Sequence, residues 1–259
     1  MVIDGKAIAE DVYLSLRASR PLALGIIVGG SNPVIDSFVR IKEKAAQRLN
    51  VSLARRELAS DATTEDAIAA VVSLAGEVDG IIVQLPLPSR IEIDPVLAAI
   101  PPQKDVDGIS AAPIVRPPVA EAVAEILVHH GVDVKGKHAV VIGSGRLVGM
   151  PSAALLASLR ADVHVLTLGD SLAPLLEADI IVSGAGEPGL IKPEHIRDGV
   201  VLIDAGTSDS PTGEGGRKIA GDADPACAAK ASLFTPVPGG VGPIAVAMIF
   251  KNLFALSLK

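Results

Sequence analysis

The sequence predicts an α/β fold of two domains, each built around a parallel sheet. Short apolar runs of strand length recur along the chain, and helix-sized segments separate them, which is the pattern of βα units. The run Arg116-Pro117-Pro118 interrupts this series, and a second α/β series follows it. Apolar residues make up 49% of the chain and aromatic residues only 2%, so we expect aliphatic cores.

The first series has five elements with clear signals. They are a helix opened by Asp4-Gly5-Lys6, a strand over 22–28, a helix from Pro33 to about Leu49, a helix capped by Thr63 or Thr64, and a strand over 81–84. Ser31 and Asn32 are cap candidates before a proline at the first helical position. In the helix after Thr64, the spacing predicts that Ile68, Val71 and Val72 share one face.

The second series begins with a helix over 119–130 that we expect to bridge the two domains. Its other predicted elements are strands over 138–142, 162–166, 179–183, 200–204 and 232–235, a helix over 148–159 and a final apolar helix over 244–256. The stretch Gly213-Glu-Gly-Gly216 predicts a mobile loop or a hairpin tip.

The net charge of −7 argues against a general binder of nucleic acids or anionic membranes. No apolar run approaches the roughly 20 residues that cross a bilayer, and no signal peptide is evident. The single cysteine, Cys227, excludes an internal disulfide framework and is expected in the core. We therefore expect a cytoplasmic protein. The five histidines form no metal-ligand pattern, so no metal site is predicted.

The segment Val140–Gly149 reads as a strand, a glycine turn and the start of a helix. Its glycines are spaced Gly143-x-Gly145-x-x-x-Gly149, one residue longer than the usual dinucleotide fingerprint. Glycines permit a tight turn and close approach of a phosphate, and the helix N-terminus offers free N–H groups to a diphosphate. The second domain is therefore predicted to be a Rossmann-type dinucleotide-binding domain, although a plain tight turn would give the same pattern.

The end of the next strand usually distinguishes NAD from NADP. No Lys or Arg lies between Thr167 and Leu176, whereas Asp170 could accept hydrogen bonds from a ribose diol and would repel a 2′-phosphate. Arg146 is the nearby cation in the glycine turn. These residues favour NAD, but Asp170 could equally be an ordinary loop aspartate.

A candidate catalytic group combines a lysine, an amide and a carboxylate. Phe38 and Lys42 are four residues apart and share a helix face. Gln84 ends a strand and precedes Pro-Leu-Pro, which presents its amide at the carboxyl edge where α/β sites lie. Asp105 and Asp107 flank Val106 in a loop, so their side chains should point to opposite sides. We therefore expect one of them to stabilise the local structure and the other to face a ligand. A desolvated lysine can accept a proton, and a carboxylate can hold donor nitrogens of a heterocycle.

The string Thr235-Pro-Val-Pro-Gly-Gly-Val-Gly-Pro243 is apolar and rich in proline and glycine, which predicts a rigid buried turn whose backbone approaches another group closely.

Taken together, these strings resemble the bifunctional methylenetetrahydrofolate dehydrogenase/methenyltetrahydrofolate cyclohydrolase family along nearly the whole chain. The matching motifs are Ile3-Asp-Gly-Lys6, Gly30-Ser-Asn-Pro33, Phe38-Val-x-x-Lys42, Gln84-Leu-Pro-Leu-Pro88, Lys104-Asp-Val-Asp-Gly108, Val148-Gly149-x-Pro151, Ile203-Asp-x-Gly206, Gly221-Asp222 and the string at 235–243.

The resemblance implies a folate-binding catalytic domain over 1–117 plus 244–259, an NAD(P)-binding domain over 118–243, and folate in the cleft between them. It implies that Lys42 is the general acid/base of the cyclohydrolase step, that Gln84 tunes its protonation and that Asp107 binds the pterin. Phe38 and the turn Pro238-Gly239-Gly240 would contact folate. The dinucleotide would be NADP, with NAD possible, held by residues of the glycine turn and of a later loop, namely Gly143, Ser144, Gly145, Arg146, Val148, Gly149 and Thr207. A homodimer is also implied.

Several positions depart from the family pattern. Phe38 replaces the usual tyrosine, which removes a hydrogen-bond donor but keeps a ring that can stack. Further departures are Val115-Arg-Pro-Pro118, Ser144-Gly145, Thr167-Leu168 and Thr207-Ser208. Three functions therefore stay open: a bifunctional enzyme, a dehydrogenase with weak or no cyclohydrolase activity, and a non-catalytic folate- or nucleotide-binding homologue.

Overall fold

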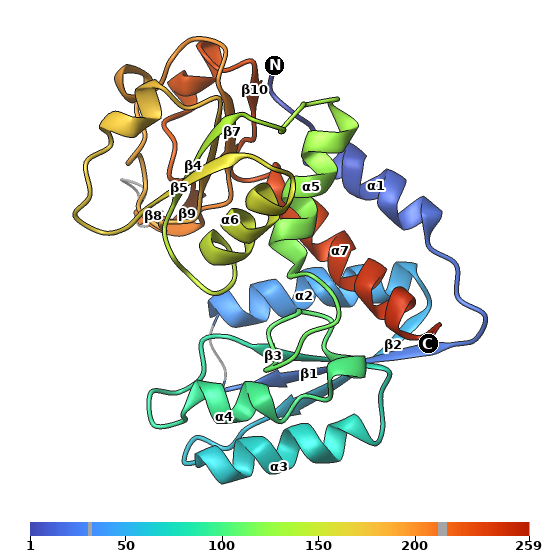
Figure 1. Ribbon diagram of the computed structural model, residues 1–259. Helices are drawn as coiled ribbons and strands as arrows, with labels where there is room; N and C mark the ends of the chain where they lie inside the picture. The colour runs from blue at the N-terminus through green and yellow to red at the C-terminus, as the bar shows by residue number, and fades with distance from the viewer. Residues whose placement is uncertain (31–32, 212–216, 259) are drawn as a thin grey trace. The chain divides into compact units, whose positions relative to one another are not determined.

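The computed structural model describes residues 1–30, 33–211 and 217–258 (Figure 1). The chain forms two compact units, one made of Met1–Asp11 with Val119–Ala245 and the other of Val12–Pro118 with Val246–Lys259. Each unit is an α/β structure with a parallel sheet, so the predicted fold class is confirmed. No helix within these residues has both the length and the apolar character needed to cross a membrane.

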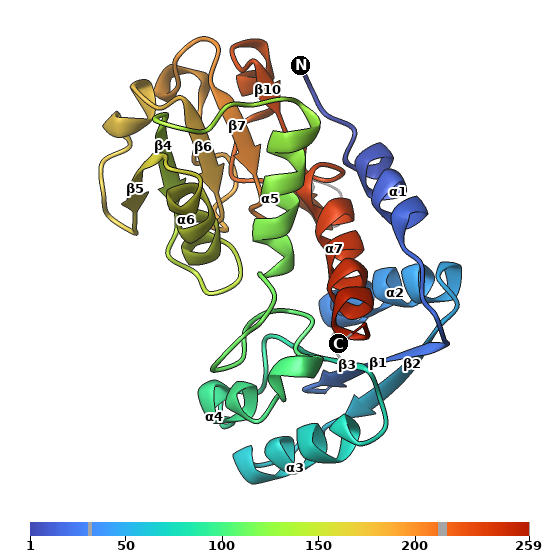
Figure 2. The same cartoon turned by 45° about the vertical axis from the view of Figure 1, so that its right-hand side comes forward.

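The unit that contains Lys42 has a three-stranded parallel sheet in the order β2-β1-β3. Its elements are β1 (Leu22–Val28), α2 (Pro33–Arg48), β2 (Val51–Glu57), α3 (Thr64–Ala75), β3 (Gly80–Gln84), α4 (Ile93–Ala98), η1 (Pro102–Lys104) and most of α7 (Val241–Leu256). Figures 1 and 2 show α2 on one face of this sheet and α3 with α4 on the other.

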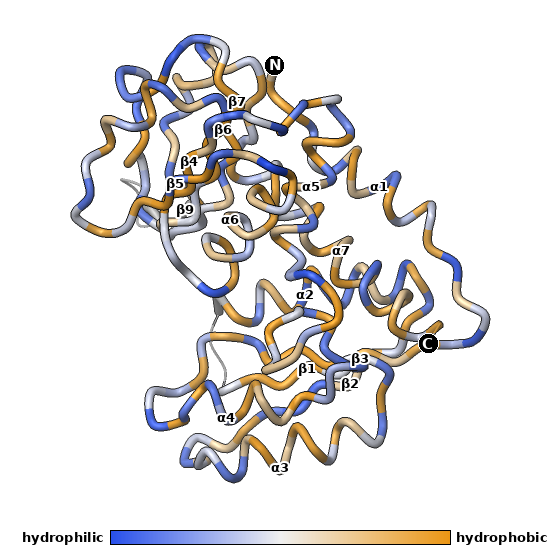
Figure 3. Tube along the Cα trace, viewed as in Figure 1, coloured by the Kyte–Doolittle hydropathy of each residue, from blue (hydrophilic) through white to orange (hydrophobic). Residues whose placement is uncertain are grey.

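Strand β1 separates two aliphatic cores because its side chains alternate between the faces of the sheet. Leu22, Leu24 and Ile26 pack with buried residues of α2 and α7. Ile27 packs on the opposite face with residues of α3 and α4. All four side chains are 3% exposed or less, so the strand is covered on both faces. The hydrophobic colouring of β1 in Figure 3 reflects this burial.

The second unit has a five-stranded parallel sheet in the order β10-β7-β6-β4-β5. In chain order it contains α1 (Gly5–Ser15, its first part), α5 (Pro118–His129, from Val119), β4 (His138–Ile142), α6 (Gly149–Ser158), β5 (Asp162–Leu166), η2 (Ala173–Leu176), β6 (Ile180–Ser183), η3 (Pro193–His195), β7 (Val201–Asp204), β8 (Ser208–Pro211), β9 (Arg217–Ala220), η4 (Pro225–Ala229) and β10 (Leu233–Phe234). Strands β8 and β9 pair antiparallel, and the predicted hairpin tip at 213–216 lies outside the described residues.

The first eleven residues cluster with the unit that has the five-stranded sheet. The sequence-based prediction groups them with the rest of residues 1–117. Backbone hydrogen bonds explain this difference, because the N–H of Ile3 donates to the carbonyl of Phe234 and the N–H of Gly5 donates to that of Gly239. These bonds join segments more than 230 residues apart, and local sequence patterns do not encode them.

Most predicted elements are confirmed within one or two residues, including the helix cap at Thr63, which forms a capping box with Asp66. Ser31 and Asn32 lie outside the described residues. Val72 is 61% exposed, so its predicted place on the buried face is wrong; Ala67, Val71 and Leu74 form that face instead. Cys227 is buried, and burial raises the pKa of its thiol to about 11, as fits a core residue.

Candidate active site

Lys42 lies on the buried face of α2. Ile35, Val39 and Ala46 precede and follow it at helical spacing, and all three belong to the core between α2 and the sheet. Lys42 is only 8% exposed. Burial lowers the pKa of its ammonium group, and the charge of Asp107 opposes this effect. An amine in this setting exchanges protons more readily than a solvated lysine does.

Gln84 provides the hydrogen-bond partner of this amine. It ends β3, and its side-chain oxygen Oε1 accepts a hydrogen bond from Lys42 Nζ at 2.8 Å. Its Nε2 donates to the carbonyl of Leu85 at 2.9 Å, which orients the amide so that the oxygen faces the lysine. Helix α2 and strand β3 therefore bring together the two residues that the sequence predicted as partners.

Asp107 is the third member of the candidate group. Desolvation raises the pKa of its carboxyl group to about 6, the charge of Lys42 partly offsets this rise, and the charge of Asp105 adds to it. The residue nevertheless keeps part of its surface exposed. The site thus holds a carboxyl group and an amine that influence each other and whose pKa values burial shifts toward neutrality, as is common where protons are moved.

The neighbouring Asp105 has a structural position, as predicted for one of the two aspartates. It is fully buried, and its Oδ2 accepts a hydrogen bond from the N–H of Ser110 at 2.8 Å. Its backbone forms a parallel bridge with Ile81 beside β3. The loop therefore uses Asp105 to hold its own shape and leaves Asp107 accessible.

Phe38 lies one helical turn before Lys42, and its side chain is 38% exposed. Ile41, which is 47% exposed, follows it on the same helix. The ring is therefore accessible at the surface of α2 and available to stack on a flat ligand.

The glycine turn between β4 and α6 has the geometry of a phosphate cradle. Gly143 has a φ of +95°, and a Cβ on Gly149 would lie 1.8 Å from the carbonyl oxygen of Gly143. A Cβ on Gly145 would meet nothing within 4 Å, and Ser144 and Arg146 beside it are exposed. The turn is thus tight at its ends and open in its middle, before the N-terminus of a ten-residue helix.

The strand order places this turn at the point where ligands bind in open parallel sheets. Along the chain, β4 is the first strand of the sheet and β6 the third, and they are neighbours at the reversal of the winding direction. Gly143 at the end of β4 packs so closely on Gly184 after β6 that a Cβ would lie 2.8 Å from its carbonyl oxygen. Thr207, after β7, is exposed. The donor set and its open centre fit a dinucleotide diphosphate.

Comparison with known proteins agrees with this geometry. Residues 3–107 match the model of the tetrahydrofolate dehydrogenase/cyclohydrolase catalytic domain, and residues 117–259 match that of the family's NAD(P)-binding domain. The chain belongs to the tetrahydrofolate dehydrogenase/cyclohydrolase family. It is 37% identical to the bifunctional protein FolD of Magnetococcus marinus, over 97% of this chain and 95% of that one.

Solved structures of the family superpose over the whole chain. The methylenetetrahydrofolate dehydrogenase-cyclohydrolase of Trypanosoma brucei, solved with NADP and an inhibitor, has a TM-score of 0.93 and 34% identity, covering 100% of this chain and 97% of that one. The bifunctional enzyme of Campylobacter jejuni has a TM-score of 0.89 and 30% identity, with 100% and 98% coverage. This chain therefore has an NAD(P)-binding domain of the family type.

In this tetrahydrofolate dehydrogenase/cyclohydrolase family member, Asp170 closes the turn after β5. Its Oδ2 accepts hydrogen bonds from the N–H of Thr167 at 2.7 Å and from the Thr167 hydroxyl at 2.8 Å. These bonds lower the pKa of the Asp170 carboxyl group, so it carries a negative charge at neutral pH. The structure brings Asp170 and Thr167 together, at the exposed end of the strand.

A buried acidic network supports the loops of the family's NAD(P)-binding domain, and the sequence did not reveal it. Asp222 accepts hydrogen bonds from Ser183 Oγ at 2.6 Å and from the N–H groups of Ala185 and Glu187, each at 2.8 Å. Asp204 accepts from Ala223 N, and its own N–H donates to Thr235 Oγ1 at 2.6 Å. The sequence signal for these aspartates is that each lies in one of the family motifs, Ile203-Asp-x-Gly206 and Gly221-Asp222.

Asp222→Ala is expected to destabilise this domain by roughly 3 kcal/mol, because the buried hydroxyl of Ser183 and two partly buried backbone N–H groups would lose their acceptor. The measurement is the urea unfolding midpoint of the purified protein. The control is Asp224→Ala, which removes a cap on η4 that accepts from Ala226 N and should cost about 1 kcal/mol. Equal losses in the two variants would show that the network does not support the loops.

The turn Pro238-Gly239-Gly240 is only partly buried, because Pro238 is exposed whereas Gly240 and Thr235 are not. The group that its backbone approaches closely is Gly5, at the start of α1: a Cβ on Gly5 would lie 1.9 Å from the carbonyl oxygen of Gly240. The predicted close approach is therefore present within the chain itself, and contact of this turn with folate stays a prediction.

Proposed function

We propose that this protein oxidises 5,10-methylenetetrahydrofolate to 5,10-methenyltetrahydrofolate with NAD(P)+ and hydrolyses the product to 10-formyltetrahydrofolate. The observation that carries the proposal is the hydrogen bond of 2.8 Å from Nζ of the buried Lys42 to Gln84 Oε1, beside the carboxyl group of Asp107. Family membership and the bifunctional names of the relatives at 34–37% identity support it.

The dinucleotide, when bound at the glycine turn, accepts the hydride that leaves the bridging methylene carbon. Loss of this hydride makes the carbon a methenyl cation. A water molecule then adds to that carbon, and Lys42 takes the proton that the water oxygen gives up. The bond from the carbon to N5 breaks, N5 regains a proton through Lys42, and the hydroxyl proton leaves as the formyl C=O forms. One proton is released overall.

Gln84 and Asp107 serve this chemistry without exchanging the proton. Gln84 Oε1 holds the lysine in one position, since the amide is itself fixed by the carbonyl of Leu85. The Asp107 carboxylate accepts hydrogen bonds from pterin nitrogens and orients the ring, while Phe38 stacks on an aromatic part of the substrate.

The decisive test incubates the purified protein with methylenetetrahydrofolate and either dinucleotide, and separately with methenyltetrahydrofolate alone. We expect reduced nicotinamide in the first reaction and 10-formyltetrahydrofolate in the second. Phe38 lacks the hydroxyl of the family's usual tyrosine and favours one rival function, a dehydrogenase without hydrolysis. Reduction without hydrolysis would establish that rival. Ligand binding without either reaction would establish a non-catalytic homologue.

We propose that NADP is the cofactor and that NAD is also accepted. The relative solved with NADP supports the former. The charge of Asp170 at the end of β5 supports the latter, because a carboxylate there repels a 2′-phosphate but can accept from a ribose hydroxyl.

Asp170→Ser is expected to raise the ratio of kcat/KM for NADP over NAD by about five- to tenfold, since it removes one negative charge beside the 2′-phosphate. Asp198→Ser is the control, because this side chain is 89% exposed in the same unit and forms an ion pair with Lys230 at 3.8 Å. An unchanged ratio in Asp170→Ser would rule out a role in cofactor choice.

We also propose that the protein is a cytoplasmic homodimer. Strand β5 is an edge of the five-stranded sheet and offers a surface in the NAD(P)-binding domain for a second copy. Light scattering on the purified protein tests this, and a monomeric mass at micromolar concentration would exclude it.

A further inference from the structure

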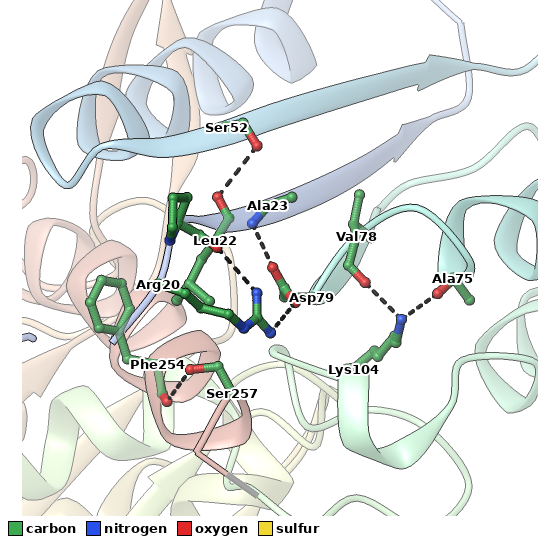
Figure 4. A network of polar contacts seen from close by, with 11 residues as sticks. Arg20, Leu22, Ala23, Ser52, Ala75, Val78, Asp79, Lys104, Phe254 and Ser257 are labelled. Atoms are coloured by element: carbon green, nitrogen blue, oxygen red, sulfur yellow. Dashed lines mark hydrogen bonds and ion pairs between the residues drawn. The ribbon is translucent and has the colours of Figure 1, made fainter. Parts of the chain in front are cut away.

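The loop that carries Asp107 is anchored at its first residue. Lys104 Nζ donates to the carbonyls of Ala75, at the end of α3, and of Val78, the latter at 2.7 Å (Figure 4). The Ala75 carbonyl lies in the last turn of α3 and the Val78 carbonyl lies beyond the helix, so neither has an intrahelical donor and a lysine amine satisfies both. Lys104 is thus used for anchoring, although it carries a charge within three residues of the proposed site.

The other loop residues are also held. Asp105 is buried and bonded to Ser110, as described above, and Val106 is fully buried in the core beside β1. Gly108 has a φ of +61°, and a Cβ there would lie 2.6 Å from the carbonyl oxygen of Val115. Between residues 104 and 108, Asp107 is therefore the one residue whose side chain does not stabilise the loop.

Asn252 closes this arrangement from a distant part of the sequence. It lies on α7 and is 7% exposed. Its Nδ2 donates to the carbonyl of Val106 at 2.9 Å and to the carbonyl of Arg116 at 3.0 Å. Both amide protons are thereby used, one on the residue directly before Asp107 and one on the segment against which Gly108 packs. A single amide thus ties together the two backbone segments that bracket Asp107.

The chemistry of the helix makes this placement unusual. Asn252 is the only asparagine in α7, and its neighbours Phe250 and Leu253 are fully buried apolar residues. A buried amide costs free energy unless it is fully bonded, and leucine would fill the same space without that cost. An asparagine at this position is explained by the carbonyls of Val106 and Arg116, which accept hydrogen bonds from its amide.

We infer that Asn252 is a positioning residue for folate binding, which acts by fixing the backbone on both sides of Asp107. The inference rests on the proposed function, because it takes Asp107 as the group that binds the pterin. Asn252 does not touch substrate in this account, and its effect passes entirely through Asp107.

A merely structural role is distinguished by a double-mutant cycle. Tetrahydrofolate and NADP are titrated calorimetrically against the wild type, Asn252→Leu, Asp107→Ala and the double variant. We expect Asn252→Leu to raise the Kd of tetrahydrofolate about tenfold and to leave the Kd of NADP within twofold. In the Asp107→Ala background the same change should alter the tetrahydrofolate Kd by less than twofold, because residues that act as a unit are not additive.

Two further variants keep the test conclusive. Asn252→Asp preserves the shape of the side chain but has no N–H to donate when ionised, so it should reproduce the loss if Asn252→Leu does not fold. Phe254→Leu gives up core packing on the same helix without removing a hydrogen bond to the loop, and it should leave both Kd values unchanged.

Additive losses in the cycle, or equal losses of tetrahydrofolate and NADP affinity, would overturn the inference and leave the proposed function standing. A wild type that binds no tetrahydrofolate would overturn the proposed function, and the inference with it.

Discussion

Lys42→Met is expected to lower the rate of methenyltetrahydrofolate hydrolysis by about 10²–10⁴-fold, which is the usual contribution of a positioned proton-transfer group. The dehydrogenase reaction should fall far less, because hydride transfer moves no proton at this amine. Methionine has a similar length and keeps the core face of α2 filled. The measurement is the turnover of each step with its own substrate, made on the same preparation.

Two comparisons separate this role from a general disturbance. Lys44→Met changes the exposed lysine on another face of the same helix and should leave both rates unchanged. Lys42→Met should also be at least as stable as the wild type, because it removes a buried charge whose desolvation lowers the lysine pKa. A large loss of both activities together with a lower unfolding midpoint would contradict a catalytic role.

The same lysine predicts the pH dependence of hydrolysis. A base must be unprotonated to take a proton from water, so the rate should rise with pH and reach half of its maximum at the pKa of Lys42. Burial lowers that pKa from 10.5, so the midpoint of the rise should lie below pH 10.5. A midpoint at or above that pH would show that another group is the base.

The sequence predicted the strands of both sheets well, because aliphatic runs such as 22–28 and 138–142 are buried on both faces and have few alternative structures. It missed β2, since Arg55, Arg56 and Glu57 break the apolar pattern at an edge of the sheet where one side is solvated. It also missed α4, a single short helix with Pro95 in its first turn. The local hydrophobic pattern therefore predicts a strand well where both faces of the strand are buried, and poorly where one face is exposed to solvent.

At the candidate site, the sequence predicted the functional residues but not the residues that hold the surrounding backbone in place. The Lys42–Gln84 pair follows from the resemblance to the family, whose motifs Phe38-Val-x-x-Lys42 and Gln84-Leu-Pro-Leu-Pro88 contain both residues. Asn252 could not be expected, since its partners Val106 and Arg116 are 146 and 136 residues away. Asp222 has the same difficulty, with a partner 39 residues distant in Ser183. Such contacts depend on tertiary packing and leave no periodic signal.

Asp107→Asn is expected to raise the KM for folate by about 10²-fold and to leave the KM for NADP nearly unchanged. The amide keeps the size of the side chain but loses the negative charge that makes its hydrogen bonds to ring N–H donors strong. In the wild type, the KM for folate should rise as pH falls below about 6, where the carboxyl group of Asp107 takes up a proton. The asparagine variant should show no such step.

The same substitution should change stability in the opposite direction from activity. The pKa of Asp107 is raised from 3.8 to about 6 on folding, so the folded state binds this proton more tightly than the unfolded state does. Stability of the wild type therefore falls as pH rises from about 4 to 6, and Asp107→Asn should be more stable above pH 6 by about 1–3 kcal/mol. Below pH 4 the two proteins should unfold alike.

These two outcomes together identify why the carboxylate is present. A residue that serves only the fold would lower the unfolding midpoint when it is replaced, and a residue that serves neither role would change nothing. Weaker folate binding combined with greater stability at pH 7 is expected only if the ionised group is held at a cost to folding because the substrate requires it. Urea unfolding at pH 4 and pH 7, run beside folate kinetics on the same samples, measures both. A variant that is less stable at pH 7 would exclude a functional carboxylate at position 107.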